Sequence, residues 1–425
     1  MFSKYNVIYQ QGDRCYVYNT ASRKIACIPA DSYSKIGQGT SMSKDRKLTT
    51  LGIVVPDETD EYQHLMTEYS KCVDSSTLTL VIMAATSCNF KCAYCYEEYM
   101  PALLNSTVSN RILTYLHNKI GQYTGVYVEW FGGEPLLATN EIISLSQNIR
   151  EICKINNRSY ISSITTNGFY LSFETFSRLL DAGVVYFQIT IDGSKQTHDR
   201  LRPLKNGGPT YDIIISNILE IKKNISSNRY FRFVIRNNVY SGNIDDSREF
   251  IDFFKKHLSS DRRFSIYQFP ISDWGGDRIK QLDKDMLIKD NVYFDPHNDV
   301  SYSNITESPA AALCYAAKRN SYVITPNSRL YKCSHYIDDI RCDYKSHTLI
   351  GDLTDDGMVI NEVALREWVT RDISCECKQC EYLPYCLYSC CPIQPIRKNK
   401  GCRGRAEKAV RSAVELFCNR GLLNE

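Results

Sequence analysis

The strongest constraint on the fold of this chain is a regular alternation of strand-like and helix-like segments between residues 77 and 270. Six short runs rich in β-branched and aromatic residues lie in this region, at residues 77–83, 126–131, 160–166, 184–191, 230–236 and 263–269. Stretches with apolar residues at helical spacing separate them. Repeated strand–helix units predict an α/β fold with a parallel sheet, because each helix returns over the sheet to the next strand. We expect a partial (β/α)6 barrel, similar to part of a TIM barrel.

Three further segments flank this predicted barrel in the 425-residue chain. Residues 1–76 contain three strand-like runs followed by an amphipathic helix at 57–75, which predicts a small N-terminal α+β unit. Residues 271–310 are irregular and are expected to form a bridging region. Residues 311–425 are rich in cysteine and are expected to form a separate C-terminal domain.

Composition excludes several classes of function. Lys and Arg number 51 against 48 Asp and Glu, a net charge of +3, so no basic surface for nucleic acid is expected. No window approaches the roughly 20 apolar residues of a membrane span, and the N-terminus lacks the apolar core of a signal peptide. We therefore expect a cytoplasmic protein. Since a reducing cytosol disfavours disulfides, 18 cysteines indicate metal or redox chemistry.

Three of these cysteines lie together at the predicted C-terminal end of the first barrel strand. Cys88, Cys92 and Cys95 have the spacing C-x3-C-x2-C, and Tyr94 precedes the third cysteine. Three thiolates on one loop can hold three irons of a [4Fe–4S] cluster and leave the fourth iron open to a small molecule. A zinc site is the alternative, but structural zinc usually takes four ligands. The loop therefore favours an iron–sulfur cluster.

Polar motifs follow the next three predicted strands. GGEP (residues 132–135) follows the second strand; its glycines let backbone approach a ligand, and Glu134 can accept a hydrogen bond from an ammonium group. TNG (residues 166–168) follows the third strand. T-x-D-G (residues 190–193) follows the fourth and leads to Arg202, which can pair with a carboxylate. Each motif alone is typical of a turn, but α/β barrels gather functional groups at these strand ends.

The order of these motifs resembles that of radical S-adenosylmethionine (radical SAM) enzymes of the sulfatase-maturase and peptide-modifying type. The resemblance covers roughly residues 78–240. It implies that the three loop cysteines ligate a [4Fe–4S] cluster whose open iron binds S-adenosylmethionine. It also implies contacts to S-adenosylmethionine from the backbone at Tyr94 near the adenine, from Gly133 and Glu134 at the methionyl amino group, and from Thr190 and Arg202 around the carboxylate and ribose. His198 is expected to be structural.

A second cysteine field lies in the C-terminal segment. Its spacing is C-x2-C-x5-C-x3-C from Cys377 to Cys390, with Cys402 downstream and Cys314 and Cys333 upstream. Four cysteines this close rarely occur without a metal, although C-x2-C pairs also bind zinc. The pattern resembles the SPASM extension of radical SAM maturases. This implies a cysteine-rich SPASM domain over residues 311–425 with one or two auxiliary [4Fe–4S] clusters.

The same resemblance implies two sets of auxiliary ligands. The outer cluster would be held by Cys377, Cys380, Cys386 and Cys402. The inner cluster would be held by Cys314, Cys333 and Cys390. Either Cys342 or a substrate group completes the inner cluster, or its fourth iron is open.

Two residues depart from the family pattern. Ser328 stands where the family has a glycine in G-x4-C before Cys333, which questions a turn but not the ligand. Ser334 follows Cys333, where sulfatase maturases have an aspartate that acts as a base. A sulfatase-maturing role would therefore lack its proton acceptor.

The implied reaction is reductive cleavage of S-adenosylmethionine to a 5′-deoxyadenosyl radical, which abstracts hydrogen from an unactivated C–H bond. An auxiliary cluster can take back the electron, so the net change is a two-electron oxidation. The expected partners are a ribosomally made precursor peptide as substrate and an external electron donor such as flavodoxin or ferredoxin. Residues 1–76 either bind the leader of that peptide as an added strand or cap the barrel.

The expected product is an intramolecular crosslink in the peptide. A cysteine thioether is the leading form, followed by a C–C or C–O bond. Oxidation of a protein side chain, as in sulfatase maturation, is the alternative, and Ser334 disfavours it. A non-enzymatic iron–sulfur electron carrier is an alternative of another class, but such a carrier needs no S-adenosylmethionine pocket.

Overall fold

The computed structural model describes residues 1–30, 45–97, 101–271, 278–281, 309–335, 337, 348–389, 391–392, 406–411 and 414–415. The chain forms two compact units. We call them the barrel unit (residues 76–298 and 320–365) and the terminal unit (residues 1–75, 299–319 and 366–425). The four-segment division expected from the sequence stays a prediction of functional domains.

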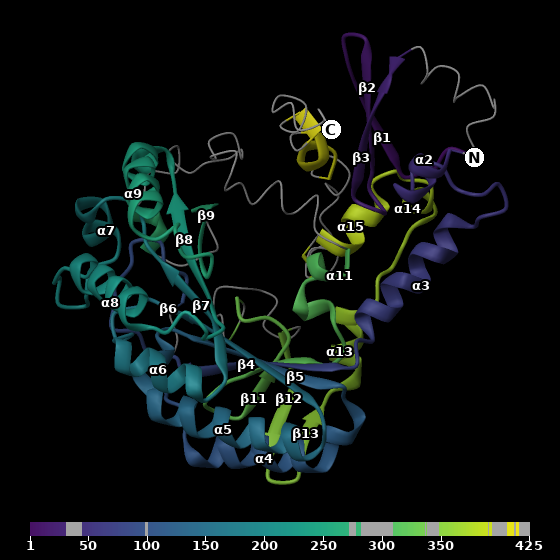
Figure 1. Cartoon of the computed structure of the whole chain (residues 1–425). Helices are drawn as coiled ribbons and strands as arrows, with labels where there is room; N and C mark the ends of the chain where they lie inside the picture. Colours follow the sequence, from purple (N-terminus) through teal and green to yellow (C-terminus); the bar gives the residue numbers. More distant parts are fainter. Residues whose placement is uncertain are drawn as a thin grey trace. The chain divides into compact units, whose positions relative to one another are not determined.

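Six consecutive parallel strands form the centre of the barrel unit (Figure 1). They are β4 (Thr77–Ala85), β5 (Gly125–Gly132), β6 (Ser159–Thr166), β7 (Val184–Thr190), β8 (Arg232–Val239) and β9 (Phe264–Pro270). All six strands expected from the sequence are present, in chain order across the sheet. The predicted partial (β/α)6 barrel is confirmed.

Helices connect these strands and cover one face of the sheet (Figure 1). They are α4 (Ser106–Lys119), α5 (Thr139–Ile155), α6 (Phe173–Asp181), α7 (Lys195–Leu201), α8 (Tyr211–Asn224) and α9 (Ile244–His257). Short 3-10 turns lie at η2 (Ile120–Gln122), η3 (Pro135–Ala138), η4 (Ser241–Asn243) and η5 (Arg278–Gln281). In β5, Val126, Val128 and Trp130 are buried, whereas the alternate residues are partly exposed. This period of two directs one set of side chains to the helices and the other into the barrel interior.

Four strands that the sequence did not predict extend the same sheet beyond β4. β10 (Ser321–Ile324) pairs with β4 in parallel, and β11 (Arg329–Tyr331), β12 (Leu349–Thr354) and β13 (Gly357–Ile360) follow in antiparallel order. Cys333 therefore follows a strand that belongs to the barrel's own sheet.

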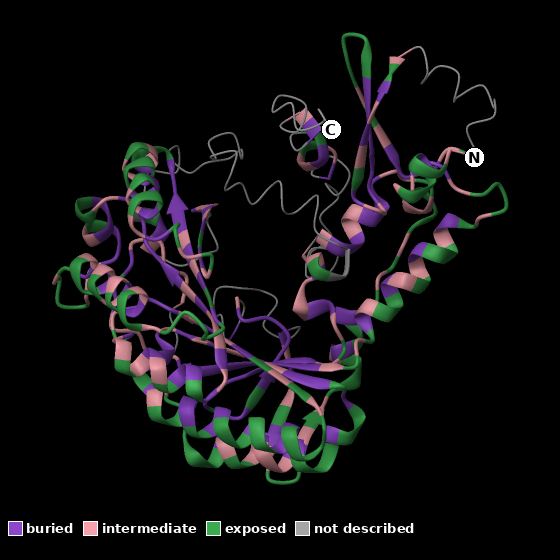
Figure 2. Ribbon diagram, in the orientation of Figure 1, coloured by how far each residue is buried: buried purple, intermediate pink, exposed green. Residues whose placement is uncertain are grey.

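The terminal unit contains a separate three-stranded antiparallel sheet in the order β1-β2-β3. Its strands are β1 (Asn6–Gln11), β2 (Arg14–Asn19) and β3 (Lys24–Pro29). The other elements of this unit are α2 (Arg46–Thr50), α3 (Glu61–Val73), α11 (Pro309–Ala312), η7 (Tyr315–Ala317), α14 (Cys375–Lys378) and α15 (Leu383–Ser389), and α13 (Glu362–Val369) spans the division between the two units in the sequence. Buried residues concentrate in the strands and along one side of the longer helices (Figure 2). Among the described residues, no helix is both long enough and apolar enough to span a bilayer.

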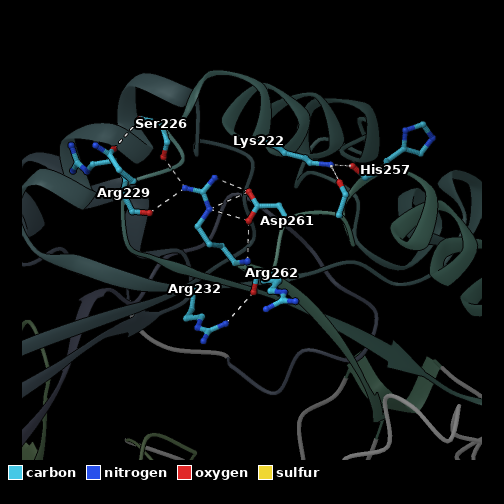
Figure 3. Close-up of polar contacts among 10 residues, drawn as sticks. Lys222, Ser226, Arg229, Arg232, His257, Asp261 and Arg262 are labelled. Atoms are coloured by element: carbon cyan, nitrogen blue, oxygen red, sulfur yellow. Dashed lines mark hydrogen bonds and ion pairs between the residues drawn. The ribbon is translucent and has the colours of Figure 1, made fainter.

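Hydrogen bonds and an ion pair connect Asp261, which lies just before β9, with Ser226 and Arg229 in the loop before β8 (Figure 3). Arg263 forms a two-pronged ion pair with Asp261, with its Nη2 donating at 2.7 Å. Its Nη1 donates to the carbonyl oxygens of Ser226 and Arg229 at 2.8 and 3.1 Å. The guanidinium also lies 4.5 Å from the ring centre of Phe231. These contacts tie the loop before β8 to the loop before β9.

Replacing Arg263 should therefore destabilise the barrel unit. We expect Arg263→Ala to lower the free energy of unfolding by about 2 kcal/mol, because several charge-assisted hydrogen bonds and a ring contact are lost together. Scanning calorimetry should show this as a fall in Tm of roughly 4 °C or more. Arg248→Ala is the matched control, because Arg248 pairs with Asp245 at an exposed site and should change stability by less than about 0.5 kcal/mol. Equal Tm values for the two variants would contradict this assignment.

Candidate active site

The three loop cysteines lie directly after β4, at the carboxyl edge of the parallel sheet. Cys88, Cys92 and Cys95 all line one cavity. Two backbone amides of the loop donate to carbonyl oxygens within residues 201–203, at 2.8 Å each. The loop is thus held between the end of the first barrel strand and the chain that follows α7.

The two glycines of GGEP bring the end of β5 against the start of the cysteine loop. A Cβ atom on Gly132 would lie 2.0 Å from the carbonyl oxygen of Ala85, and one on Gly133 would lie 2.5 Å from that of Ser87. The Gly133 amide donates to Ala85 at 2.9 Å. Gly132 has φ +125°, a conformation that L side chains rarely adopt. These positions require glycine because backbone meets backbone there.

The Glu134 carboxylate is fully buried and satisfied within the protein. It accepts hydrogen bonds from the Thr166 hydroxyl at 2.6 Å, the Asn167 amide at 2.8 Å and the Leu136 amide at 3.0 Å. Burial raises the pKa of Glu134, while these hydrogen bonds act in the opposite direction. Glu134 therefore joins the strand-end motifs of β5 and β6, and its side chain is not part of the cavity lining.

The phenol of Tyr94 is the centre of a buried polar cluster. It donates to the Asp192 carboxylate and accepts from Arg202 Nη1 at 2.7 Å and from Asn238 Nδ2 at 2.9 Å. One donor and two acceptor positions exhaust the hydrogen-bonding capacity of a phenol. The Tyr94 backbone, not its hydroxyl, thus remains for a ligand, in line with the expected role near the adenine.

Arg202 combines satisfied and unsatisfied donors at the cavity wall. It is 7% exposed, lines the cavity, and lies 5.8 Å from the ring centre of Phe90. Its buried Nε has no hydrogen-bond partner among the described residues. Burial raises the pKa of Asp192, with Arg202 and Tyr94 opposing the rise, so a compensated charge pair stands at the cavity wall. The free Nε is a donor that an anionic or carbonyl ligand can use.

His198 is a structural residue, as expected. Its Nδ1 accepts from the Asp192 backbone amide at 3.2 Å, so the proton of the neutral ring lies on Nε2. Burial lowers the pKa of His198 well below its usual range. The neutral ring packs against Tyr211 with centroids 5.7 Å apart. His198 holds the turn that carries Asp192.

These elements enclose a cavity of about 440 Å³ within the barrel unit. Of the predicted S-adenosylmethionine contacts, Tyr94, Gly133, Thr190 and Arg202 line it. Arg236 and Phe269 also line the cavity, and the Arg236 guanidinium lies 4.0 Å from the ring centre of Phe269.

Several residues of the cavity lining were not predicted from the sequence. Among them are the polar and aromatic residues Tyr96, Gln188, Arg236, Asn238, Phe269 and His335. Arg236 and Asn238 end the fifth strand and point into the barrel by alternation, so the strand-end rule could have identified them. His335 comes from the sheet extension, and no spacing signal marks it.

His335 and Tyr96 form a stacked pair in the cavity lining. Their ring centres are 5.1 Å apart and their planes differ by 8°. Burial lowers the pKa of His335 to about 4, so the ring is neutral at neutral pH. The cavity lining therefore combines three cysteines with several aromatic side chains.

Burial raises the pKa of each loop thiol. The pKa of Cys88 rises to about 12, with the nearby Glu134 adding to the effect, and the pKa values of Cys92 and Cys95 are also raised. Metal binding must displace these protons. Within the described ranges, no three His, Cys, Asp or Glu side chains gather closely enough to hold a single metal ion.

Sequence comparison assigns the family. Residues 83–254 match the family model of the Radical SAM superfamily. This span runs from β4 to α9 and contains every strand-end motif described above. This part of the chain is a radical SAM domain. Its cofactors are accordingly a [4Fe–4S] cluster and S-adenosylmethionine.

Individual relatives are distant. The "Cysteine-type anaerobic sulfatase-maturating enzyme" of Clostridium novyi (strain NT) is 22% identical over 349 residues, which cover 76% of this chain and 88% of that protein. The "Fe-coproporphyrin III synthase" of Methanosarcina barkeri (strain Fusaro / DSM 804) is 25% identical over 118 residues, 28% of each chain. A solved structure of native anSMEcpe with bound AdoMet and Kp18Cys peptide has a TM-score of 0.57 at 16% identity, covering 82% of this chain and all (100%) of that chain. That likeness shows the shared fold.

The cavity of this radical SAM enzyme fits the two cofactors. Its donor set is three thiols on one short loop, and thiolates are the usual ligands of iron–sulfur clusters. Arg202, whose buried Nε has no partner among the described residues, and Gly133 line the same space. We expect Cys88, Cys92 and Cys95 to hold the cluster, with S-adenosylmethionine between the Gly133 and Arg202 sides.

The predicted auxiliary ligands are only partly within the described chain. Cys333 is buried in the barrel unit, whereas Cys314, Cys377, Cys380 and Cys386 belong to the terminal unit. The other three lie outside the described residues: Cys342, Cys390 and Cys402. Both auxiliary ligand sets stay predictions.

Arg202→Lys should weaken binding of S-adenosylmethionine. Lysine keeps the charge but lacks the planar fork that holds Tyr94 and offers Nε to a ligand, so we expect Kd to rise roughly 10-fold or more. Equilibrium dialysis on reconstituted protein measures this directly. Arg200→Lys is the control, since Arg200 donates to the Tyr240 hydroxyl at 3.0 Å and does not line the cavity. An unchanged Kd in Arg202→Lys would exclude this arginine from the binding site.

Proposed function

We propose that this radical SAM enzyme modifies a ribosomally made precursor peptide by forming an intramolecular crosslink, with a cysteine thioether as the leading product. The observation that carries the proposal is the composition of the cavity lining. Besides the family motifs, the lining includes Arg236, Gln188 and the stacked pair of Tyr96 and His335, which those motifs do not use.

Three polar residues of the cavity lining, Gln188, Arg236 and Asn238, are suited to bind a peptide segment. Arg236 is stacked on Phe269, and its Nε donates to Asn238 Oδ1 at 2.9 Å. Gln188 accepts from the Tyr267 hydroxyl at 2.9 Å, which fixes its amide toward the cavity. Fixed guanidinium and amide groups can bind the carbonyls and carboxylates of a peptide. The similar fold of anSMEcpe, solved with a bound peptide, supports this choice of substrate class.

When bound, the reduced cluster and S-adenosylmethionine supply a carbon radical that can take hydrogen from an unactivated C–H bond. The residues of this chain position the reactants and exclude water. Hydrogen bonds among Tyr94, Asp192 and Arg202 fix the positions of these side chains. The sulfur of a substrate cysteine would then bond to the carbon that has lost hydrogen, and its thiol proton would be released to solvent or to a base of the substrate. The electron released in this closure would pass to an auxiliary cluster, and an external donor such as flavodoxin or ferredoxin would supply the first electron.

Side-chain oxidation of a protein, as in sulfatase maturation, is the second candidate. The relative from Clostridium novyi supports it at 22% identity. Ser334 argues against it, because a buried serine hydroxyl (4% exposed) replaces the carboxylate expected to act as a base. A serine at neutral pH does not accept a proton as a carboxylate does.

Anaerobic reconstitution tests the enzyme proposal. With dithionite and S-adenosylmethionine, the protein should release 5′-deoxyadenosine, and Cys95→Ala should abolish this product because the cluster loses one of its three thiolates. Cys386→Ala should retain cleavage but lose crosslinking. A crosslinked peptide loses two hydrogens by mass spectrometry, whereas a carbonyl that reacts with a hydrazide probe would indicate side-chain oxidation. Absence of 5′-deoxyadenosine from the unmodified protein would refute the enzyme proposal.

The variant Arg236→Gln tests whether Arg236 contacts the peptide substrate. Loss of the guanidinium should raise KM for the peptide roughly 10-fold, with a smaller effect on kcat, because the residue binds substrate without taking part in bond cleavage. Arg232→Gln is the matched control: Arg232 begins the same strand, and its Nη1 donates to the Arg262 carbonyl at 3.0 Å outside the cavity. If both variants give the same KM, Arg236 does not contact the peptide.

A further inference from the structure

Both faces of β2, the central strand of the N-terminal sheet in the terminal unit, are buried. Cys15 through Asn19 are all buried along it. On one face, Val17 packs with Leu48, Ile53 and Val54 from the segment that follows the sheet. The side chains on the other face are buried as well, so they also have a packing partner.

The second face packs on residues of the C-terminal part of the chain, among them the cysteine segment (residues 375–389). Tyr16 and Tyr18 of β2 form an apolar cluster with Tyr382, Ala406, Val410 and Val414, and Cys380 and Cys386 pack against that cluster. Two of the three described thiols assigned to the outer cluster therefore lie against residues of the N-terminal sheet and its neighbours. The sheet and the cysteine segment form one core.

Three hydrogen bonds bind the cysteine segment to the N-terminal residues. Lys4 Nζ donates to the Lys378 carbonyl at 3.3 Å, and the Thr20 hydroxyl donates to the Glu381 carbonyl at 2.6 Å. Lys378 lies between Cys377 and Cys380, and Glu381 directly follows Cys380. Thr20 is 1% exposed, so its bond is shielded from water.

Arg23 makes the third of these contacts. Its Nη2 donates to the Ser389 hydroxyl at 2.7 Å, at the C-terminal end of α15 and directly before Cys390. Arg23 is 2% exposed and has φ +58°, a conformation rare for a residue with a side chain. A buried positive charge is thus held beside the helix that carries Cys386.

We infer that the β1–β3 sheet is the outer wall of the outer auxiliary cluster, with Thr20 and Arg23 as its positioning residues. This inference rests on the auxiliary clusters of the proposed function, and it names the residues that support the outer cluster. Hydrogen-bonded neighbours orient metal ligands and control solvent access, and a buried cation stabilises the more negative, reduced state of a cluster. The sheet is then an integral part of the metal site and does not require a leader peptide to cover its faces.

The test uses the full-length chain with Cys88, Cys92 and Cys95 replaced by alanine, so that only auxiliary clusters are reconstituted. Thr20→Val and Arg23→Gln are introduced separately, and anaerobic iron loss to a chelator is followed. We expect iron loss to become roughly 10-fold faster or more in both variants. EPR-monitored titration should show a more negative reduction potential in Arg23→Gln, and Arg23→Lys should restore it in part.

Ser22→Ala is the matched control. Ser22 lies in the same turn, but its hydroxyl donates to the Leu51 carbonyl at 2.5 Å, within the N-terminal residues. It should leave iron loss and potential unchanged. Circular dichroism separates a local effect from misfolding, and Arg23→Lys rescue tests the charge. Iron loss and potential equal to the control in both Thr20→Val and Arg23→Gln overturn the inference, as does zinc or no metal in the background protein. No readout here depends on cleavage of S-adenosylmethionine, so failure of the proposed enzyme activity is recognised separately.

Discussion

The carboxyl ends of β4 and β5 approach so closely that no side chain fits between their backbones, and the active site depends on this contact. Gly132 and Gly133 make it possible, because a Cβ on either would overlap the carbonyl oxygens of Ala85 and Ser87. Cys88 follows Ser87 directly, so the same contact sets where the cysteine loop begins. Glu134 then extends the arrangement to β6 through its buried hydrogen bonds. Contacts within the protein thus join the carboxyl ends of β4, β5 and β6.

Charge is arranged around this backbone frame in compensated groups. Asp192 and Arg202 share the Tyr94 phenol, which reduces the cost of burying both charges. His198 stays neutral and holds the Asp192 turn through its backbone. A site whose polar groups are fixed in this way needs little reorganisation when a ligand develops charge.

The sequence predicted the barrel and the motifs at its strand ends because both depend on local signals. Alternating apolar residues mark each strand, and the motifs follow strand ends within a few residues. It did not predict β10–β13, three of which have only three or four residues and so carry too little periodicity to identify. Ser328 shows a different limit. It replaces the expected glycine but still adopts φ +61°, and its hydroxyl accepts from Arg111 Nη1 at 2.9 Å. The turn is kept by a long-range contact that no local pattern reveals.

The residues that line the cavity differ in how they relate to the family. Tyr94, Gly133 and Arg202 belong to motifs predicted to bind cofactors common to the superfamily, whereas Arg236, Gln188 and His335 belong to no motif. The two groups are connected, because Asn238 accepts from Arg236 and donates to Tyr94. A substrate group that moves Arg236 would therefore act on the hydrogen bonds around Tyr94. Coupling free energies are reciprocal, so any effect of substrate on cofactor affinity through these hydrogen bonds requires an equal effect of the cofactor on substrate affinity.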